Sequence, residues 1–235
     1  MSEATFRSDM TVQLVNSMAK DSDVAMAARV STVSGTHEDV VDLTKDAGLI
    51  NYLMRDRHGS PFEHNAFTFY IEAPLFVFRE FQRHRMASYN EESGRYKELE
   101  PVFYVTAEDR NLVQVGKPGA YTFEKGDYLQ TKVAAAEIQR NSFESYGAYQ
   151  AMLNKGIARE VARMVLPLNI FSSMYVTMNA RSLMNFLSLR SLEQGTYQSF
   201  PQQEIADVAT QMELIFSEKM PLTHQAFIKN GRVAP

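Results

Sequence analysis

The residues best suited to chemistry lie in the stretch RHRMASYNEESGRY, from Arg83 to Tyr96. It combines four basic side chains with two carboxylates, two serines, an asparagine and a glycine. Arginine presents a planar fork of N–H donors that matches phosphate oxygens, and Ser93-Gly94-Arg95 adds a hydroxyl, a close backbone approach and another fork. A solvated, salt-bridged turn is the commoner outcome for a charge run. The neighbouring side chains favour instead a site for a planar anionic ligand; they are Phe78, Phe81, Met86, Tyr89 and Tyr96.

A second polar stretch is HGSPFEH, from His58 to His64, which its glycine and proline mark as a loop. Two histidines and a glutamate could in principle bind a metal ion. Their spacing is not one helical turn, and Gly-Ser-Pro separates them, so we expect no metal. Hydrogen bonding to a ligand or to nearby backbone is the preferred interpretation.

Four further arginines are candidate anion contacts. Arg159 and Arg163 lie one helical turn apart, which fits either a solvated face or phosphate contacts, and nothing local decides between them. In a helix over residues 179–190, Arg181, Asn185 and Ser188 share a polar face, whereas Arg190 falls on the apolar side. Burying an unpaired arginine is costly. Either the helix ends at Arg190, or this residue meets an anionic group other than the one that Arg181 serves.

Hydrophobic patterning predicts the elements that must position these residues. Apolar and alternating runs predict strands at residues 10–15, 66–72, 101–106 and 174–178. Spacings of three and four predict helices at 25–30, within 37–57, from Pro74 to Arg83, at 127–153, 156–166 and 179–190, after residue 202 and from residue 221. The helix from Pro74 is expected to bring Glu80 and Arg83 side by side, and Asp127 is expected to cap the long helix.

The remaining segments are predicted from turn chemistry. Residues 31–36 read as a turn, and the central motif and Gly116–Gly126 read as loops, the latter flexible. Residues 199–202 resemble a capping box, and the tail after the last helix is expected to fray. The long helix is expected to turn an apolar stripe toward the core; its members are Leu129, Val133, Ala136, Phe143 and Tyr146.

The amino-acid composition excludes several classes of protein. The 235 residues are 45% hydrophobic, which supports a sizeable core, and the net charge of −4 argues against a general nucleic-acid binder. The sequence has no cysteine, which excludes disulfides, thiolate metal sites and a cysteine nucleophile. No apolar run approaches the roughly 18 residues of a membrane span, and the polar start MSEATFRSDM lacks a signal core. We therefore expect a cytoplasmic protein with no membrane or nucleic-acid partner.

The triplet Arg83-His84-Arg85, followed after seven residues by Ser93-Gly94-Arg95-Tyr96, resembles the signature of the flavin-dependent thymidylate synthases. Residues 58–64, 162–169 and 179–190 resemble the same family in the same order, and the likeness runs from about Ala27 to Phe227. It implies a single domain over residues 1–235 with an α+β fold, mainly an antiparallel sheet flanked by long helices. It also implies a homotetramer whose active sites are shared between subunits.

The resemblance also implies residue roles. The FAD contacts would be Ser60, Arg83, His84, Arg85, Glu91, Asn179, Ala180, Arg181 and Asn185, with His58 near the flavin and the folate. The dUMP contacts would be Glu80, Phe81, Gln82, Arg83, Glu91, Glu92, Ser93, Gly94, Arg95, Arg163 and Arg190. By the same analogy, Arg163 comes from a neighbouring subunit, and Arg190 is the catalytic residue, which contacts the pyrimidine and favours ionisation at N3.

The implied reaction converts dUMP to dTMP, with 5,10-methylenetetrahydrofolate as the one-carbon donor and NADPH as the reductant. Without a cysteine, a thiolate cannot activate the ring, and a reduced flavin can supply the electrons while the protein positions and polarises. Ser93 would need a nearby base to act as a nucleophile, so we interpret it as a phosphate or ring contact. Two alternatives remain: a non-catalytic flavin or nucleotide binder, and a single-stranded nucleic-acid binder that uses arginines and aromatics.

Overall fold

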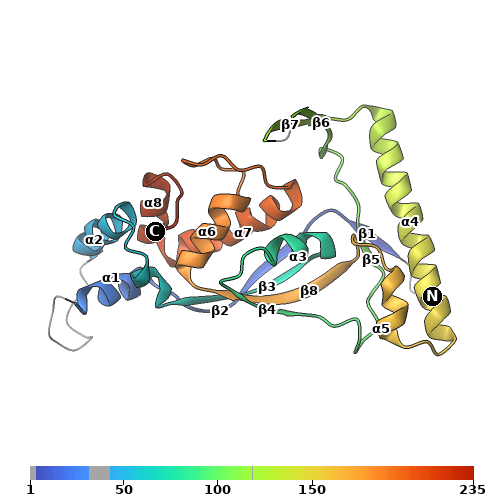
Figure 1. The fold of residues 1–235 in the computed structure, drawn as a ribbon, viewed down its shortest axis with the longest axis horizontal. Helices are drawn as coiled ribbons and strands as arrows, with labels where there is room; N and C mark the ends of the chain where they lie inside the picture. The colour runs from blue at the N-terminus through green and yellow to red at the C-terminus, as the bar shows by residue number, and fades with distance from the viewer. Residues whose placement is uncertain (1–3, 32–42, 118) are drawn as a thin grey trace. The chain divides into compact units, whose positions relative to one another are not determined.

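The computed structural model of the chain describes residues 4–31, 43–117 and 119–235 (Figure 1). Within it the chain divides into two compact units. The first unit comprises Met1–Asp9, Glu72–Arg79 and Glu91–Ser173; the second comprises Met10–Ile71, Glu80–Asn90 and Met174–Pro235. Of the residues predicted to form the turn at 31–36, all but Ser31 lie outside the described residues, as does the start of the helical region predicted within 37–57.

The second unit contains most of a four-stranded sheet with the order β2-β3-β8-β4. Its strands are β2 (Thr11–Met18), β3 (Ala66–Pro74), β8 (Phe171–Met178) and β4 (Ser88–Glu91). The predicted alternation on β3 is confirmed, because Phe67, Phe69 and Ile71 are fully buried. On the opposite face, the hydroxyls of Thr68 and Thr177 lie 3.0 Å apart. This alternation gives the sheet one apolar face for helices to cover.

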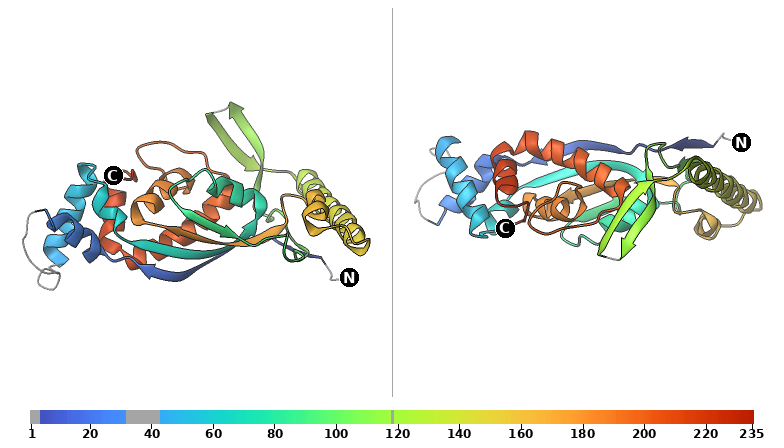
Figure 2. Two further views of the ribbon diagram at one scale, coloured as in Figure 1. Left: turned by 60° about the horizontal axis from the view of Figure 1, so that its bottom comes forward. Right: turned by 90° about the horizontal axis from the view of Figure 1, so that it is seen from above.

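Among its described residues, the second unit also has six helical segments. They are α1 (Asp21–Arg29), α2 (Leu43–Arg55), the short 3-10 helix η1 (Ser60–Glu63), α6 (Ala180–Arg190), α7 (Gln203–Lys219) and α8 (Pro221–Lys229). Helices α6 and α7 lie over the same face of the sheet (Figures 1 and 2). Phe216 of α7 packs edge-on against Phe67, with ring centroids 6.0 Å apart. The buried side chain of Asp21 accepts hydrogen bonds from the backbone N–H groups of Leu222 and Thr223, so it caps α8.

The first unit has a smaller core and one long helix. Strand β1 (Thr5–Arg7) pairs in parallel with β5 (Val102–Tyr104), and β6 (Asn111–Lys117) pairs antiparallel with β7 (Ala120–Lys125). The helices are α3 (Leu75–Phe81, most of it in this unit), α4 (Tyr128–Asn154), α5 (Arg159–Ala162) and the 3-10 helix η2 (Arg163–Val165). The predicted cap of α4 is confirmed: the Asp127 carboxylate accepts from the backbone N–H of Gln130 at 2.7 Å.

Two predicted loops are wrong. Residues 116–126 belong largely to the β6–β7 hairpin, where Gly116 and Gly119 have φ of +104° and +83°, backbone conformations that glycine adopts without strain. The glycines therefore mark a hairpin turn. In the central motif, residues 88–91 form β4 at the edge of the sheet beside β8, and only the flanking residues are loop.

Other boundaries also differ from the predictions. The helix predicted over 156–166 is only the short α5 followed by η2, and α7 begins without a side-chain cap, so the predicted capping box is wrong. The stripe on α4 meets the core at Tyr146, which packs edge-on against the buried Phe103 with ring centroids 5.9 Å apart. The rest of the stripe is more open than predicted, because Leu129, Val133 and Phe143 are 68%, 52% and 55% exposed. The tail after α8 is not frayed, since Arg232 is buried and ion-paired. Across the described residues, no helix has both the length and the apolar character needed to cross a membrane.

Candidate active site

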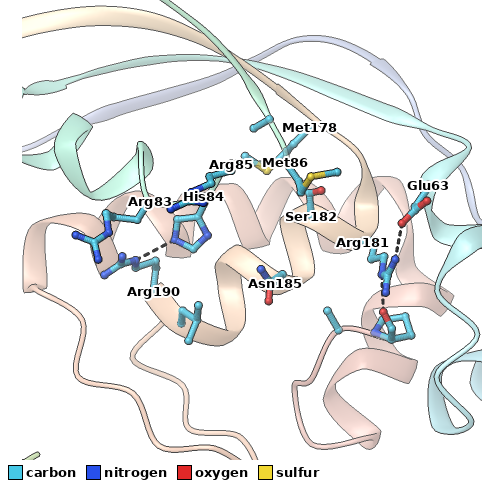
Figure 3. A pocket seen from close by; sticks show the side chains of 14 residues that line it. Glu63, Arg83, His84, Arg85, Met86, Met178, Arg181, Ser182, Asn185 and Arg190 are labelled. Carbon is cyan, nitrogen blue, oxygen red and sulfur yellow. Dashed lines mark hydrogen bonds and ion pairs between the residues drawn. The ribbon is translucent and has the colours of Figure 1, made fainter.

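A cavity of about 670 Å³ lies in the second unit (Figure 3). Its walls come from the loop after α3, from one face of α6 and from the tail after α8. The lining residues are Glu63, Arg83, His84, Arg85, Met86, Ala87, Met178, Arg181, Ser182, Asn185, Leu189, Arg190, Ala234 and Pro235. Cavities of about 300–1,000 Å³ with convergent polar groups are typical of cofactor and ligand sites. Six of the predicted site residues are therefore brought together: Arg83, His84, Arg85, Arg181, Asn185 and Arg190.

Two asparagines begin α6 and thereby orient its polar face. Asn179 Oδ1 accepts from the N–H of Ser182 at 2.9 Å, as an N-cap does. The buried Asn65 accepts from the N–H of Ala180 at 2.7 Å and donates to the carbonyl of Phe62 at 3.1 Å. The apolar side of α6 is fully buried, as predicted, at Leu183, Phe186 and Leu187. Asn65 was missed because a lone asparagine after a loop gives no local signal of a cap 115 residues away.

Arg190 satisfies both predicted alternatives at once. Helix α6 ends at this residue, and its guanidinium Nη1 lies 2.6 Å from a carboxylate oxygen of Glu80. Its Nε donates to His84 Nε2 at 3.1 Å. The prediction that Glu80 and Arg83 share one helical face is wrong, because α3 ends at Phe81 and the carboxylate of Glu80 pairs with Arg190.

His84 is held as a neutral ring. A guanidinium N–H can only donate, so His84 Nε2 must accept and the ring proton must lie on Nδ1. Desolvation, together with the positive charge of Arg190, lowers the pKa of His84 to about 4. The imidazole also meets the ring of Phe186 edge-on, with centroids 5.0 Å apart. At neutral pH this arrangement fixes the tautomer and the orientation of both side chains.

Tyr89 holds the backbone turn that carries these groups. Its hydroxyl lies 2.9 Å from the carbonyl oxygen of Phe81 and 2.6 Å from that of His84, both acceptors for its single proton. Burial raises the pKa of Tyr89 to about 12, so the hydroxyl keeps that proton. Phe81 in turn stacks on Phe186, with centroids 4.8 Å apart. The sequence showed Tyr89 only as a neighbouring aromatic, because its partners are backbone atoms.

Arg181 bridges two walls of the cavity. Its Nη1 lies 2.6 Å from a carboxylate oxygen of Glu63, and its Nε donates to a backbone oxygen of Pro235 at 2.6 Å (Figure 3). Neither partner was predicted from the sequence. Glu63 belongs to the loop of residues 58–64, for which no specific role of this carboxylate was predicted, and the tail was expected to fray.

Several predicted residues of the second unit do not line the cavity. They are His58, Ser60, Glu80, Phe81, Gln82, Asn179 and Ala180. Glu80, Phe81, Asn179 and Ala180 support lining residues through the contacts described above. The exposed His58 instead stacks on the ring of Tyr52, with centroids 5.6 Å apart.

The other predicted nucleotide contacts belong to the first unit, where they form a polar cluster around the end of β4. Ser172 and Ser173 of β8 hydrogen-bond to the carboxylates of Glu91 and Glu92 at 3.4 and 3.3 Å. Ser93 Oγ accepts from the backbone N–H of Arg95 at 3.3 Å. These bonds order residues 91–95 as a turn with one serine and two carboxylates close together.

Gly94 and Arg163 meet within this cluster. A Cβ atom at Gly94 would crowd Leu99 at 3.2 Å and would lie 3.5 Å from Arg163 Cδ, in ordinary contact with the arginine stem. Desolvation raises the pKa of Glu91, while Ser172 and the charge of Arg163 oppose that rise and Glu92 adds to it. Arg95 lies 3.4 Å from a carboxylate oxygen of Glu160. Glu91, Glu92, Ser93, Gly94, Arg95 and Arg163 are thus brought together in this unit.

Within residues 4–31, 43–117 and 119–235, no three histidine or carboxylate side chains are grouped to hold a metal ion.

The site now allows the chain to be placed among known proteins. Residues 13–222 match the family described as thymidylate synthase complementing protein. The chain is 58% identical to the flavin-dependent thymidylate synthase of Streptomyces avermitilis over 235 residues, covering 98% of this chain and 96% of that protein. It is 56% identical to that of Tropheryma whipplei over 236 residues, covering 99% and 98%.

Solved structures agree with this result. The UMP/dUMP methylase PolB from Streptomyces cacaoi bound with 5-Br dUMP superposes with a TM-score of 0.93 at 48% identity, covering 98% of this chain and 100% of the other. The complex with 5-Br UMP gives 0.91 at 47% identity, covering 99% of each chain. The mixed helix and sheet fold with antiparallel sheets is thereby confirmed.

The fold and the site define a flavin-dependent methyltransferase. The chain belongs to the thymidylate synthase complementing protein family, the flavin-dependent thymidylate synthases that its central motif predicted.

The cavity has the chemistry that a flavin nucleotide requires. Of the described residues, four arginines and the neutral His84 line it, together with the carboxylate of Glu63. Arginine forks suit a pyrophosphate, the amide of Asn185 and the hydroxyl of Ser182 suit ring or ribose edges, and the apolar side chains suit a flat ring. Those apolar side chains are Met86, Met178 and Leu189. The residues present therefore fit a flavin.

Proposed function

We propose that this protein is an FAD-dependent thymidylate synthase that converts dUMP to dTMP, with 5,10-methylenetetrahydrofolate as the one-carbon donor and NADPH as the reductant. One observation carries the proposal: arginines from two distant parts of the chain, Arg83 after α3 and both Arg181 and Arg190 on α6, line the same cavity. The names of the relatives support the substrate and the flavin. The reaction balances with the net uptake of one proton. The methylene carbon and the hydride equivalent of NADPH become the methyl group of dTMP, the hydrogen on C5 of the uracil leaves as a proton, and tetrahydrofolate and NADP are the other products.

The residues are assigned in three groups. FAD contacts fall to Ser60, Arg83, His84, Arg85, Glu91, Asn179, Ala180, Arg181 and Asn185, with His58 near the flavin. The dUMP contacts fall to Glu80, Phe81, Gln82, Arg83, Glu91, Glu92, Ser93, Gly94, Arg95, Arg163 and Arg190. Bound flavin, once reduced, supplies the electrons. Arg190 is the catalytic residue, since its cation stabilises negative charge that develops on the uracil.

The chain's own contacts support the role of Arg190. Glu80 and His84 hold its guanidinium from two sides. A donor that is already oriented stabilises developing charge without reorganising during the reaction. The absence of cysteine from the sequence is consistent with a route that needs no thiolate nucleophile.

We further propose that residues 1–235 act as one domain within a homotetramer with shared active sites. The family match spans segments of both compact units, which supports one functional domain. The exposed apolar side chains of α4 support subunit contact, because clustered apolar residues on a surface commonly mark an interface. Leu129, Val133 and Phe143 are the clearest examples.

A second candidate substrate is UMP. A structural neighbour at 47% identity carries the printed description of a UMP/dUMP methylase and was solved with 5-Br UMP. UMP differs from dUMP by the ribose 2′-hydroxyl, so discrimination depends on whether the site can accommodate or hydrogen-bond that group. The relatives at 56–58% identity are named thymidylate synthases, which favours dUMP.

The test is product formation by purified protein given FAD, NADPH and methylenetetrahydrofolate, with dUMP or UMP in parallel. We expect dTMP from dUMP, measured by chromatography, and bleaching of the yellow flavin by NADPH. Arg190→Ala should abolish dTMP formation while flavin stays bound, and Arg181→Ala should lower the flavin content. Arg140→Ala on α4, whose partners are Glu137 and Glu144, is the control. A wild-type protein that binds no flavin, or forms no dTMP with every component present, contradicts the proposal.

A further inference from the structure

The tail after α8 is a wall of the cavity. Helix α8 ends at Lys229, the next residues turn back, and Ala234 and Pro235 line the cavity. The turn uses two left-handed residues, Gly231 with φ of +79° and Arg232 with φ of +55°. Non-glycine residues rarely adopt this conformation and keep it only where their surroundings determine it. This tail segment, residues 230–235, is therefore held in place by specific contacts.

One anchor of the tail segment is buried. Arg232 makes a bidentate ion pair with Glu213 of α7, at 2.8 and 2.6 Å, and His224 lies 2.9 Å from the same carboxylate. The carbonyl of Gly231 accepts from the N–H of Thr196 at 2.8 Å. Although burial acts to raise the pKa of Glu213, its hydrogen bonds from His224 and Arg232 lower it to about 2. The carboxylate thus stays charged, and the start of the tail segment is fixed.

The second anchor is Arg57, an exposed residue that does not line the cavity. Its Nη1 donates to the carbonyl oxygens of Val233 and Ala234 at 2.8 and 3.3 Å. Arg57 itself has φ of +61°, another left-handed residue that is not glycine. The N–H groups of Arg57 and His58 donate to the carbonyls of Met54 and Leu53, at 3.4 and 2.9 Å, so this left-handed residue caps the C-terminus of α2. The two hydrogen bonds to carbonyl oxygens, and not this backbone conformation, tie Arg57 to the tail segment.

The tail segment in turn holds Arg181. The backbone oxygen of Pro235 accepts from Arg181 Nε at 2.6 Å. Gly59 leaves the space that this contact needs, because a Cβ atom there would be 2.6 Å from Arg181 Cζ and 2.8 Å from the Pro235 oxygen. The position of the Arg181 guanidinium therefore depends on where the tail segment lies.

From this chain of contacts we propose that Arg57 is a positioning residue for the flavin: by holding the carbonyls of Val233 and Ala234 it fixes one wall of the cavity and, through Pro235, orients Arg181. The inference rests on the proposed function in one respect, namely that a flavin nucleotide occupies this cavity. Arg57 acts through the tail segment and touches none of the reacting groups.

The test begins with Arg57→Ala and a flavin titration of the apoprotein. The dissociation constant for FAD should rise about 5- to 20-fold, because the wall and Arg181 lose their fixed geometry. Global stability should change little, since Arg57 is exposed and its partners can bind water. Arg57→Lys, which keeps a donor, should recover part of the affinity. Arg55→Ala is the matched control, because it removes a cation two residues away that pairs with Asp56.

A second arm tests whether Arg57 acts through the tail segment. In a variant that lacks residues 233–235, which binds FAD more weakly, Arg57→Ala should cause no further loss. In the flavin-free full chain, the backbone amides of Gly231 and Arg232, which donate to the carbonyls of Ile228 and Phe227, should exchange with deuterium faster in Arg57→Ala than in wild type. Unchanged exchange, or equal losses with and without the tail, overturns the inference.

The outcomes separate this inference from the proposed function. If the wild-type protein binds no FAD, the proposed function fails, and the exchange measurement still decides whether Arg57 holds the tail. If the wild-type protein binds FAD and Arg57→Ala binds it equally well, the role of Arg57 is refuted while the proposed function stands.

Discussion

Single residues in this site are defined by their hydrogen-bond partners. Arg190 is shared between a carboxylate of Glu80 and the ring nitrogen of His84, and Tyr89 closes the turn beneath that ring. A neutral histidine beside an arginine is an unusual choice, because the positive charge opposes protonation. As a consequence, the guanidinium of Arg190 has a fixed orientation at the cavity, and the neutral His84 beside it does not compete for anions.

The neutral state of His84 makes a prediction about acid sensitivity. The pKa is about 4 in the folded chain against 6.5 for an ordinary histidine, so the unfolded state binds a proton more readily. Stability from this residue is complete above pH 6.5 and is lost as the pH falls toward 4. When the pH is lowered from 7.5 to 5, the unfolding free energy of wild type should therefore fall by about 1–2 kcal/mol more than that of His84→Gln.

Urea denaturation at the two pH values measures this difference. His64→Gln, which removes an exposed histidine, should behave as wild type does. An equal loss of stability in wild type and His84→Gln would show that the histidine is not held neutral.

Among the elements, α6 does most to build the cavity. Its buried face fixes its rotation, and its first turn is tied to the loop of residues 58–65 through Asn65. Arg181, Asn185 and Arg190 then project from one helix at positions set by helical geometry. The placement of three functional side chains thus depends on how the helix begins.

Removing the second cap should loosen α6. Asn65→Ala leaves the N–H of Ala180 and the carbonyl of Phe62 without a partner, and both lie at a buried position. We expect a loss of about 1–3 kcal/mol in unfolding free energy and weaker flavin binding. Asn154→Ala, at the exposed end of α4, is the control and should change stability by no more than about 0.5 kcal/mol. An unchanged denaturation midpoint for Asn65→Ala would refute the capping role.

At the scale of the whole molecule, the open question is which subunit supplies Arg163. In this chain Arg163 lies beside Gly94, which is compatible with donation within one subunit. The family resemblance implies donation from a neighbour. The exposed apolar side chains of α4 offer a surface that the proposed assembly could bury.

Mixing two inactive proteins decides between these arrangements. Arg163→Ala and Arg190→Ala subunits should each be inactive alone, but after exchange about a quarter of shared sites would carry both arginines. Partial recovery of dTMP formation is therefore expected. Native mass spectrometry verifies that mixed oligomers have formed. If they have formed and activity stays absent, each site takes both arginines from one chain.

Local patterns accounted for most of the secondary structure. The alternation of Phe67, Phe69 and Ile71, the cap of α4 at Asp127 and the faces of α6 depend only on neighbouring residues, so the sequence determined them. The motif from Arg83 to Tyr96 determined the family in the same way. The β6–β7 hairpin was missed because its glycines fit a flexible loop as well as a turn, and only strand pairing distinguishes the two.

The contacts that make the site were decided by tertiary structure alone. The bond between Arg190 and His84 joins residues 106 positions apart, and that between Arg181 and Pro235 joins residues 54 positions apart. Residue spacing along a helix or strand carries no information about such pairs, because they arise when separate elements pack together. The sequence thus determined which chemical groups the protein has and which face of each element carries them. Packing decided which groups meet, because burial and pairing are properties of the folded chain.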